Sequence, residues 1–586
     1  MPSIADLENL LVGIDNKGYG AGKRVLGRYQ ADDMSLWFTY APADRYAPPG
    51  RLIVQVDPHD FGFPDHLVNT DTRRTCLAHF LSHAAGEGLE RGKLRQVRID
   101  SPGQVVLART SVKVETDSVQ FRLGYHWEAR GRMILGRTSA KIFCRSLPQL
   151  IRSLRFDRLD QGRVAKLVDC VENQQSIRSQ LEGRDLVGFV GDGSILPREG
   201  NTDIPMKDGA VPFRTPPTLE VSFEVPHGAS VSGLGIESGK LTCISGANFQ
   251  GKTTLLEALG QGIYDHVPGD GRELVVCLPD LAFANKENRR IVNSTDISPF
   301  ITKLPGVSDC RMFSSAASSG STSQAASIID AIESRVSAIL IDEDDSAVNL
   351  LVKDNRLRRL VPGDIEPIRP LIDIVKSIPR EKGITPIMVV GALGEFTEIA
   401  DTIVMMHDFR VEDATNRIEE FRRDPTVELV PEVAEKLDRG VKEELGKAKT
   451  ESRSAQLHGH PFGEVRQRKP KWSAGGEKTK VKPIGRDEIS IKMGRRRTSI
   501  DLRGDIQKTL VEGSQVRAIG DAVIYSSRYM DGERTLRQVV DAVHRDTLDG
   551  GLDVISRFDT PGQNDYVQFS RHQLFYALSR FPWLQS

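Results

Sequence analysis

The stretch Leu241–Leu259, LTCISGANFQGKTTLLEAL, constrains the fold of this chain more than any other. An apolar run ends at Gly246, a short loop follows, and a helical pattern begins near Lys252. The loop has the spacing G-x-x-x-x-G-K-[ST], and it lies between a predicted strand and a predicted helix, as that pattern requires. We therefore predict an α/β unit with a phosphate-binding loop. The alternative is a glycine turn that binds nothing.

The residue types in this loop suit the phosphate tail of a nucleotide. Glycines let the backbone curl so that successive amides point at phosphate oxygens, and the start of the helix adds partial positive charge. Lys252 is predicted to contact the terminal phosphates, and the Thr253 hydroxyl to bind Mg²⁺. ATP and magnesium are therefore the expected cofactors. The predicted nucleotide-binding residues of the loop are Gly246, Ala247, Asn248, Phe249, Gln250, Gly251, Lys252, Thr253 and Thr254.

A second acidic site is predicted about ninety residues later, where SAILIDEDDSAVN carries an apolar run into Asp342 and Glu343. An aspartate at the end of a strand supports Mg²⁺, and the glutamate after it orients and deprotonates the attacking water. Glu343 and Lys252 are the predicted catalytic residues, and Thr253 and Asp342 the predicted metal ligands. Strands also end in acids simply because a turn follows, so the pattern alone leaves both interpretations open.

The chain divides into four predicted regions, as expected at 586 residues. Short alternating strands and helical stretches predict an α+β domain over 1–163. Strands that alternate with helices, with apolar runs typical of parallel strands, predict an α/β core over 164–430. A polar region over 431–483 predicts a helix and a flexible basic linker. Renewed periodicity predicts a small, mostly helical domain over 484–586.

Composition excludes several classes of protein. The 79 basic and 80 acidic side chains nearly cancel, so the whole molecule does not steer an anion. The six cysteines form no CxxC pair, which argues against a disulfide framework or a zinc site. The N-terminus lacks the bases of a signal peptide, and no apolar run approaches about 18 residues. We expect a cytoplasmic protein without direct membrane contact.

The region before the acidic strand resembles the ATPases of the ABC class. A small-residue turn, SSGSTSQ, precedes a predicted helix, and the usual D-E-P-T-S-A-L-D reads here as DEDDSAVN over 342–349. The resemblance implies a homodimer, because a serine-glycine turn at a helix N-terminus then contacts the nucleotide of the opposing protomer. A flexible serine-rich loop is the alternative. The residues that the resemblance assigns to this contact are Ser319, Gly320, Ser321, Ser323 and Gln324.

A narrower resemblance covers most of the chain. The strings IDNKGYGAGKRVLGRY, VGDGSILPR, HVPGDGRELVV, DISPFI and LIDEDDSAVN occur in the order and spacing of the predicted ATPase of the ABC class. That family has an ABC-type P-loop core with added N-terminal and C-terminal domains, and it has been linked to RNA. The resemblance therefore implies RNA or DNA as a partner.

The sequence also departs from the usual ABC pattern. ABC ATPases place a histidine that senses the γ-phosphate after the strand that follows the acidic one. Here PIMVVGALGEF has Gly391 at that place and no histidine. The glutamine of the Q-loop and the aromatic that stacks on adenine have no clear counterpart. Slow turnover, or substitution by another group, is expected.

Two basic regions are candidates for contact with nucleic acid. Residues 463–497 contain twelve Lys/Arg and four acids, with Trp472 available to stack on a base. The N-terminal domain has two glycine-rich basic turns, one of which interleaves Tyr19 and Tyr29 among its bases. Ordinary solvated surface is the alternative for both. The candidates are Lys17, Lys23, Arg24, Arg28, Arg132, Arg137, Arg468, Lys469, Trp472, Arg495, Arg496 and Arg497.

Three functions fit these observations. The first is an ATPase that dimerises around ATP and acts on RNA or DNA. The second is an ATP-gated nucleic-acid-binding scaffold with little hydrolysis, which the missing histidine favours. The third is the ATPase subunit of a transporter, for which the added domains and the basic segment have no evident use.

Overall fold

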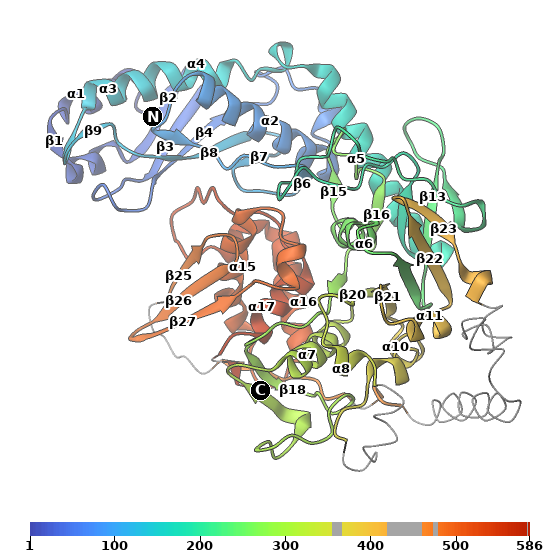
Figure 1. The fold of residues 1–586 in the computed structure, drawn as a ribbon. Coiled ribbons are helices and arrows are strands. Elements are labelled where there is room, and N and C mark those ends of the chain that lie inside the picture. The colour runs from blue at the N-terminus through green and yellow to red at the C-terminus, as the bar shows by residue number, and fades with distance from the viewer. Residues whose placement is uncertain (354–365, 419–459, 464, 473–478, 583, 586) are drawn as a thin grey trace, which may run out of the picture.

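The computed structural model describes residues 1–586 except 354–365, 419–459, 464, 473–478, 583 and 586. Figure 1 shows an N-terminal domain at the top left and an α/β core at the right. The C-terminal domain, orange to red, lies beneath the N-terminal domain and beside the core. Most of the helix and linker predicted over 431–483 falls outside the described residues.

The N-terminal domain is an antiparallel sheet with helices packed along it. The strands follow the order β2-β3-β4-β8-β5, and β7 pairs with β8. One hydrophobic cluster joins this sheet to the surrounding helices. The bounds are α1 Ile4–Gly13, β2 Gly27–Ala31, β3 Met34–Tyr40, β4 Gly50–Val56, α2 Asp71–Arg91, β5 Val97–Arg98, β7 Val112–Val114, β8 Val119–Tyr125, α3 Gly136–Lys141, α4 Leu147–Arg152 and α5 Gln161–Leu181.

The core is a six-stranded sheet of order β17-β20-β21-β14-β22-β23, in which only the β22–β23 pair is antiparallel. Both faces of the sheet are buried. Along β20, Ala338 and Leu340 pack on the side of α6, whereas Ile339 and Ile341 pack on the side of α7. The bounds are β14 Thr242–Gly246, α6 Lys252–Gln261, β17 Leu281–Phe283, α7 Gly320–Ser334, β20 Ala338–Asp342, α8 Val348–Leu351, α10 Ser377–Lys382, β21 Thr385–Val390, α11 Glu395–Ile399, β22 Thr402–His407 and β23 Arg410–Asp413.

A second, antiparallel sheet of order β12-β13-β11-β16 covers α6. Helix α6 therefore lies between two sheets, and its apolar residues Leu255, Leu256 and Leu259 are fully buried. This packing fixes the start of the helix, where the phosphate-binding loop ends. The bounds are β11 Leu186–Gly191, β12 Glu220–Phe223, β13 Val231–Glu237 and β16 Val275–Cys277.

The C-terminal domain contains an antiparallel sheet, β25-β26-β27, as well as the predicted helices. The sheet lies over 479–501, so residues 479–483 belong to its first strand and not to the predicted flexible linker. Alternation explains this, because Ile489, Ile491 and Met493 point into the helices while Lys492 between the last two faces outward. The bounds are β25 Thr479–Ile484, β26 Glu488–Met493, β27 Arg496–Asp501, α15 Gly513–Tyr525, α16 Leu536–Gly550 and α17 Arg571–Ser579.

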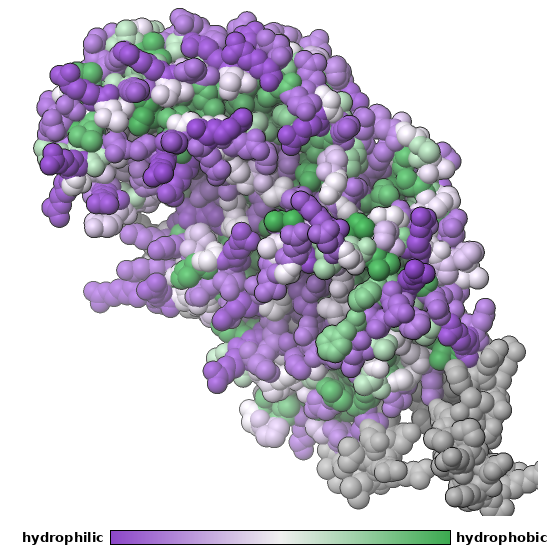
Figure 2. All heavy atoms as spheres, turned by 45° about the horizontal axis from the view of Figure 1, so that its top comes forward, coloured by the Kyte–Doolittle hydropathy of each residue, from purple (hydrophilic) through white to green (hydrophobic). Residues whose placement is uncertain are grey.

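The C-terminal domain is tied to the N-terminal domain by buried polar contacts. The guanidinium of Arg109 donates to both carboxylate oxygens of Glu512, at 2.9 and 3.2 Å. Arg122 pairs with Asp553 at 2.7 Å. On the face shown in Figure 2 hydrophilic residues predominate, with hydrophobic ones between them. Within the part of the chain that the structure describes, no helix is long and apolar enough to cross a bilayer.

Candidate nucleotide site

The parallel sheet brings three segments to one edge. Strand β21 lies between β20 and β14, with Val389 opposite Asp342 on one side and Val390 opposite Ser245 on the other. The carboxyl ends of parallel strands meet at the same edge of a sheet, which is where α/β proteins bind ligands. The phosphate-binding loop after β14, the acids after β20 and the loop after β21 are therefore neighbours.

Two glycines give the phosphate-binding loop its shape. Gly246 has φ +132°, and a Cβ there would lie 2.2 Å from the carbonyl oxygen of Met406. Gly251 has φ +91° and immediately precedes α6. Within the described residues, no side chain caps this helix. The amides of its first turn are thus left for an external acceptor, which matches the prediction of an anion-binding loop.

Lys252 is folded back onto the loop that precedes it. Its Nζ donates to the carbonyl oxygens of Gly246 and Ala247, each at 2.8 Å, and the residue is only 7% exposed. The ammonium group is therefore held among the backbone atoms of the loop, and its predicted contact with phosphates stays a prediction.

The two predicted metal ligands are in direct contact. The hydroxyl of Thr253 donates to Oδ2 of Asp342 at 2.7 Å. Burial raises the pKa of Asp342, while the hydrogen bonds from Thr253 and the amide of Asp344 oppose that rise. No described group of three or more His, Cys, Asp or Glu could hold a metal by itself. A hydroxyl and a single carboxylate suit Mg²⁺, because Mg²⁺ takes its remaining ligands from phosphates and water.

Glu343, the predicted base, is held by the loop after β21. Its carboxylate accepts the amides of Gly391 at 2.7 Å, Ala392 at 3.0 Å and Leu393 at 3.1 Å. The sequence predicted neither these donors nor their convergence. They occupy the place where ABC ATPases have the sensing histidine.

The remaining residues of the phosphate-binding loop differ in their surroundings. Ala247 and Asn248 are exposed, and Thr254 is half-buried. Gln250 accepts the amide of Asp408 at 2.5 Å, which links the loop to the turn after β22. Phe249 is 93% exposed in a left-handed conformation, with φ +63°.

The serine-glycine turn begins α7, as predicted, but only part of it faces outward. Ser319 caps the helix and is exposed, and Ser321 donates to Asn349 at 2.8 Å. Ser323 and Gln324 are fully buried, so the assignment of their side chains to a partner's nucleotide is wrong. The Gln324 amide instead donates to Ser346 and accepts from the amide of Ala347, which fixes the acidic loop to α7.

Asn285 is a site residue that the sequence did not identify. It follows β17, the neighbour of β20, and its Oδ1 accepts the amide of Asp342 at 2.9 Å. The backbone N–H of Asn285 donates to Asp505 of the C-terminal domain at 2.9 Å. Lys508 of the same domain pairs with Asp345 at 2.6 Å. The C-terminal domain thus supports the acidic loop. In the sequence, the apolar run before Asn285 was the one sign that this residue follows a strand.

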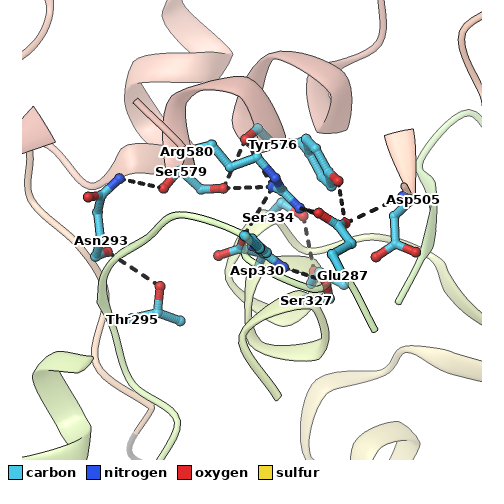
Figure 3. A network of polar contacts seen from close by, with 12 residues as sticks. Glu287, Asn293, Thr295, Ser327, Asp330, Ser334, Asp505, Tyr576, Ser579 and Arg580 are labelled. Carbon is cyan, nitrogen blue, oxygen red and sulfur yellow. Dashed lines mark hydrogen bonds and ion pairs between the residues drawn. The ribbon is translucent and has the colours of Figure 1, made fainter. Parts of the chain in front are cut away.

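A buried ionic network joins the C-terminal domain to α7 (Figure 3). Arg580 pairs with Glu287 at 2.8 Å, and Glu287 also accepts the hydroxyl of Tyr576. Arg468 belongs to the same network and pairs with Asp330 at 2.6 Å. Because Arg468 is fully buried, its prediction as a nucleic-acid contact is wrong.

Other candidates for nucleic-acid contact are also placed by the structure. Trp472 is half-buried and stacks on Phe581 with ring centroids 5.4 Å apart, so Phe581 occupies one face of the ring that was predicted to stack on a base. Tyr19 and Tyr29 are buried, which removes the predicted stacking partners of the N-terminal domain. The candidates that remain exposed are Lys17, Lys23, Arg24, Arg28, Arg132, Arg137, Lys469, Arg495, Arg496 and Arg497.

The two basic turns of the N-terminal domain lie side by side. Lys17 and Gly18 of β1 (Lys17–Gly18) pair with β10 (Met133–Ile134), which pairs in turn with β9 (Ala129–Arg130). Arg132 lies in the connection between these last two strands. Segments more than one hundred residues apart in the sequence therefore present their bases on one surface.

Comparisons with known proteins agree with this geometry. Three family models match successive parts of the chain: the ATPase of the ABC class N-terminal model at 4–158, the ABC ATPase P-loop domain at 160–439 and the MRB1590 C-terminal domain at 480–586. The uncharacterized protein MJ1628 of Methanocaldococcus jannaschii is 32% identical over 293 residues. The match spans 48% of this chain and 62% of that relative's length.

Solved structures of ABC cassettes also align with the core. One is cbiO1 from Clostridium perfringens, part of the ABC transporter complex cbiONQ. It is 13% identical, with 43% of this chain and 98% of that chain covered and a TM-score of 0.26. The other is the ADP conformation of MJ1267, an ATP-binding cassette of an ABC transporter. It is 13% identical, with 43% and 97% covered and a TM-score of 0.25. Because these TM-scores are low, the assignment of the chain to a family rests on the family models alone. On those models, the chain belongs to the ATPases of the ABC class, with N-terminal and C-terminal domains added to the P-loop domain.

Proposed function

We propose that the protein is a magnesium-dependent ATPase that closes as a homodimer around ATP and couples this closure to binding of RNA or DNA. The observation that carries the proposal is the contact of Thr253 with Asp342 at 2.7 Å, next to a lysine and an uncapped helix start. Such a site combines amide donors for phosphates with two oxygen ligands for Mg²⁺.

The chain's own residues divide the work of hydrolysis. The loop amides and Lys252 bind the phosphates, and Thr253 and Asp342 hold Mg²⁺, which neutralises phosphate charge when bound. Glu343 takes a proton from the water whose oxygen attacks the terminal phosphorus. The bond from that phosphorus to the bridging oxygen breaks, and ADP leaves with the electron pair.

Exposed groups around the site support closure of two protomers. Phe249 of the phosphate-binding loop is 93% exposed, and Val348 beside the acidic loop is 58% exposed. Ser319, Gly320 and Ser321, at the start of α7, are exposed or partly exposed. Large apolar side chains exposed beside a ligand site are typical of a surface that a partner covers.

The C-terminal sheet supports binding of nucleic acid. Lys480, Lys492 and Arg497 lie directly opposite one another across β25, β26 and β27. All three are exposed. Like charges at opposed positions destabilise a sheet, and a polyanion relieves that repulsion by replacing their counterions.

The hydrolysis proposal is tested by measuring ATP turnover with and without single-stranded RNA. Glu343→Gln is expected to lower turnover at least about 100-fold while ATP binding survives. Glu395→Gln, which neutralises an exposed carboxylate in the same region, is the matched control and is expected to keep turnover. Negligible turnover in the wild type and in both variants, with ATP binding retained, would instead favour the second candidate, an ATP-gated scaffold. The capture of Glu343 by the loop after β21 favours this candidate.

The nucleic-acid proposal is tested by the salt dependence of binding. Lys480→Gln, Lys492→Gln and Arg497→Gln together are expected to weaken binding and to flatten its dependence on salt. The control replaces three exposed lysines elsewhere, Lys93, Lys166 and Lys207, by glutamine. Equal loss in both triple variants would assign the effect to net charge alone, and absence of binding at low salt would refute the coupling.

A further inference from the structure

The loop after β21 has the geometry of an anion site. Three successive amides, from Gly391, Ala392 and Leu393, converge on Oε2 of Glu343 within 3.1 Å. Concave runs of backbone N–H groups of this kind bind carboxylate and phosphate oxygens alike. The donors carry no titrating proton and are fixed by the end of a buried strand.

The position of this loop points to a phosphate. Because β21 lies between β14 and β20, the loop lies between the phosphate-binding loop and Asp342. A Cβ built on Gly391 would be 3.7 Å from Nζ of Lys252 and 3.7 Å from Oδ1 of Asn248. Gly391, which carries the first of these amides, therefore lies beside the lysine that is predicted to hold the terminal phosphates.

We propose that the amides of Gly391, Ala392 and Leu393 bind the terminal phosphate of ATP, in the place of the absent histidine, and that Glu343 occupies this site while no nucleotide is bound. The inference rests on the proposed binding of ATP. The terminal phosphate and the Glu343 carboxylate then compete for the same three donors. Glu343 becomes free to accept a proton from water only when that phosphate displaces it, whereas ADP leaves it in place.

Nucleotide affinities test this competition. Mg-ADP and a non-hydrolysable Mg-ATP analogue are titrated into the full chain. Ala392→Pro removes one amide donor, and Ala392→Gly keeps it. Loss of a hydrogen bond to a charged group is worth about ten-fold in binding. In the Glu343→Ala background, where no carboxylate competes for the same donor, Ala392→Pro is therefore expected to lower the preference for the analogue over ADP by about ten-fold with ADP affinity retained, and Ala392→Gly to keep the preference.

Glu343→Ala provides a second variant that leaves the loop intact. Removal of the competing carboxylate is expected to raise the preference for the analogue over ADP by about five-fold or more, because no carboxylate then has to leave the amides before the phosphate binds. If Ala392→Pro also weakens the binding of ADP, the result for Glu343→Ala decides whether the inference holds. An unchanged preference in Glu343→Ala would overturn the inference and leave the ATP site standing. Absence of binding of either nucleotide to the wild type would refute the proposed function itself.

Discussion

Removal of the Arg468 guanidinium is predicted to destabilise the protein strongly. Its Nε donates to Glu333 at 2.8 Å, one Nη donates to Asp330 at 2.6 Å, and the residue is fully buried. Asp330 keeps Arg290 as a partner in the absence of Arg468. Among the hydrogen bonds of the described residues, Glu333 keeps only the one from the backbone amide of residue 468, at 2.8 Å. A buried carboxylate that loses its ion-pair partner costs about 3–5 kcal/mol, which is the loss expected for Arg468→Met.

The pH dependence gives this prediction a second signature. Burial already raises the pKa of Glu333, and the Arg468 charge opposes that rise. In Arg468→Met the folded pKa rises further above the unfolded value. Protonation of Glu333 therefore favours the folded variant, and the loss of stability becomes smaller as pH falls through the raised pKa. Above the raised pKa the full penalty remains.

Chemical denaturation at pH 8 and pH 6, followed by the fluorescence of Trp472 and the other tryptophans, measures both effects. Glu333→Gln in the Arg468→Met background removes the stranded charge and is expected to restore most of the stability. Lys469→Met, at the exposed neighbouring position, is the control and is expected to stay within about 0.5 kcal/mol of wild type. A loss for Arg468→Met no larger than that of the control would refute the reasoning.

Three further outcomes follow from single residues. Gly246→Ala is expected to cost about 2–3 kcal/mol and to abolish ATP binding, because its Cβ would meet the carbonyl of Met406; Gly394→Ala, with open space around it, is the denaturation control. Burial lowers the pKa of His572 to about 4, so its neutral form stabilises the fold above pH 6.5 and loses that contribution as pH falls. Wild type should therefore lose about 2 kcal/mol between pH 7.5 and pH 5, and equal loss in His572→Gln would contradict this cause. Phe249→Ser is expected to weaken ATP-dependent self-association about ten-fold in sedimentation experiments without changing the free energy of unfolding; an unchanged association constant would exclude this side chain from the interface.

The sequence predicted the parts of the site that depend on local pattern. The spacing of Gly246, Gly251 and Lys252 requires a particular backbone, and the structure has that backbone after a buried strand. The apolar run before Asp342 predicts a buried strand, which the register places next to β21. Local pattern was sufficient in both cases because the chemistry lies within a few residues of the motif.

The burial of a side chain by segments distant in the sequence could not be predicted in the same way. Arg468 lies in a basic stretch and gives no local sign that Asp330 and Glu333 surround it. Trp472 is paired with Phe581, more than one hundred residues away. The first strand of the C-terminal sheet begins at Thr479, but the bases around it gave residues up to 483 the composition of a linker. Composition indicates solvation only when no other segment packs on the apolar positions.

The amide site after β21 was beyond the reach of sequence reasoning for a different reason. Its donors are backbone N–H groups, which every residue except proline carries. The sequence GAL at 391–393 therefore showed only the missing histidine. Only the strand order, which sets β21 between β14 and β20, reveals where those amides point.

Equilibrium binding of Mg-ATP to the purified protein tests the central claim most directly. Titration calorimetry is expected to show binding to wild type, and at least about ten-fold weaker binding both to Lys252→Ala and to wild type without magnesium. Lys286→Ala, a lysine of the neighbouring loop that donates to Ser346, shows whether any loss is specific to the phosphate-binding loop. Absence of binding to wild type, or equal affinity in Lys252→Ala, would contradict the account.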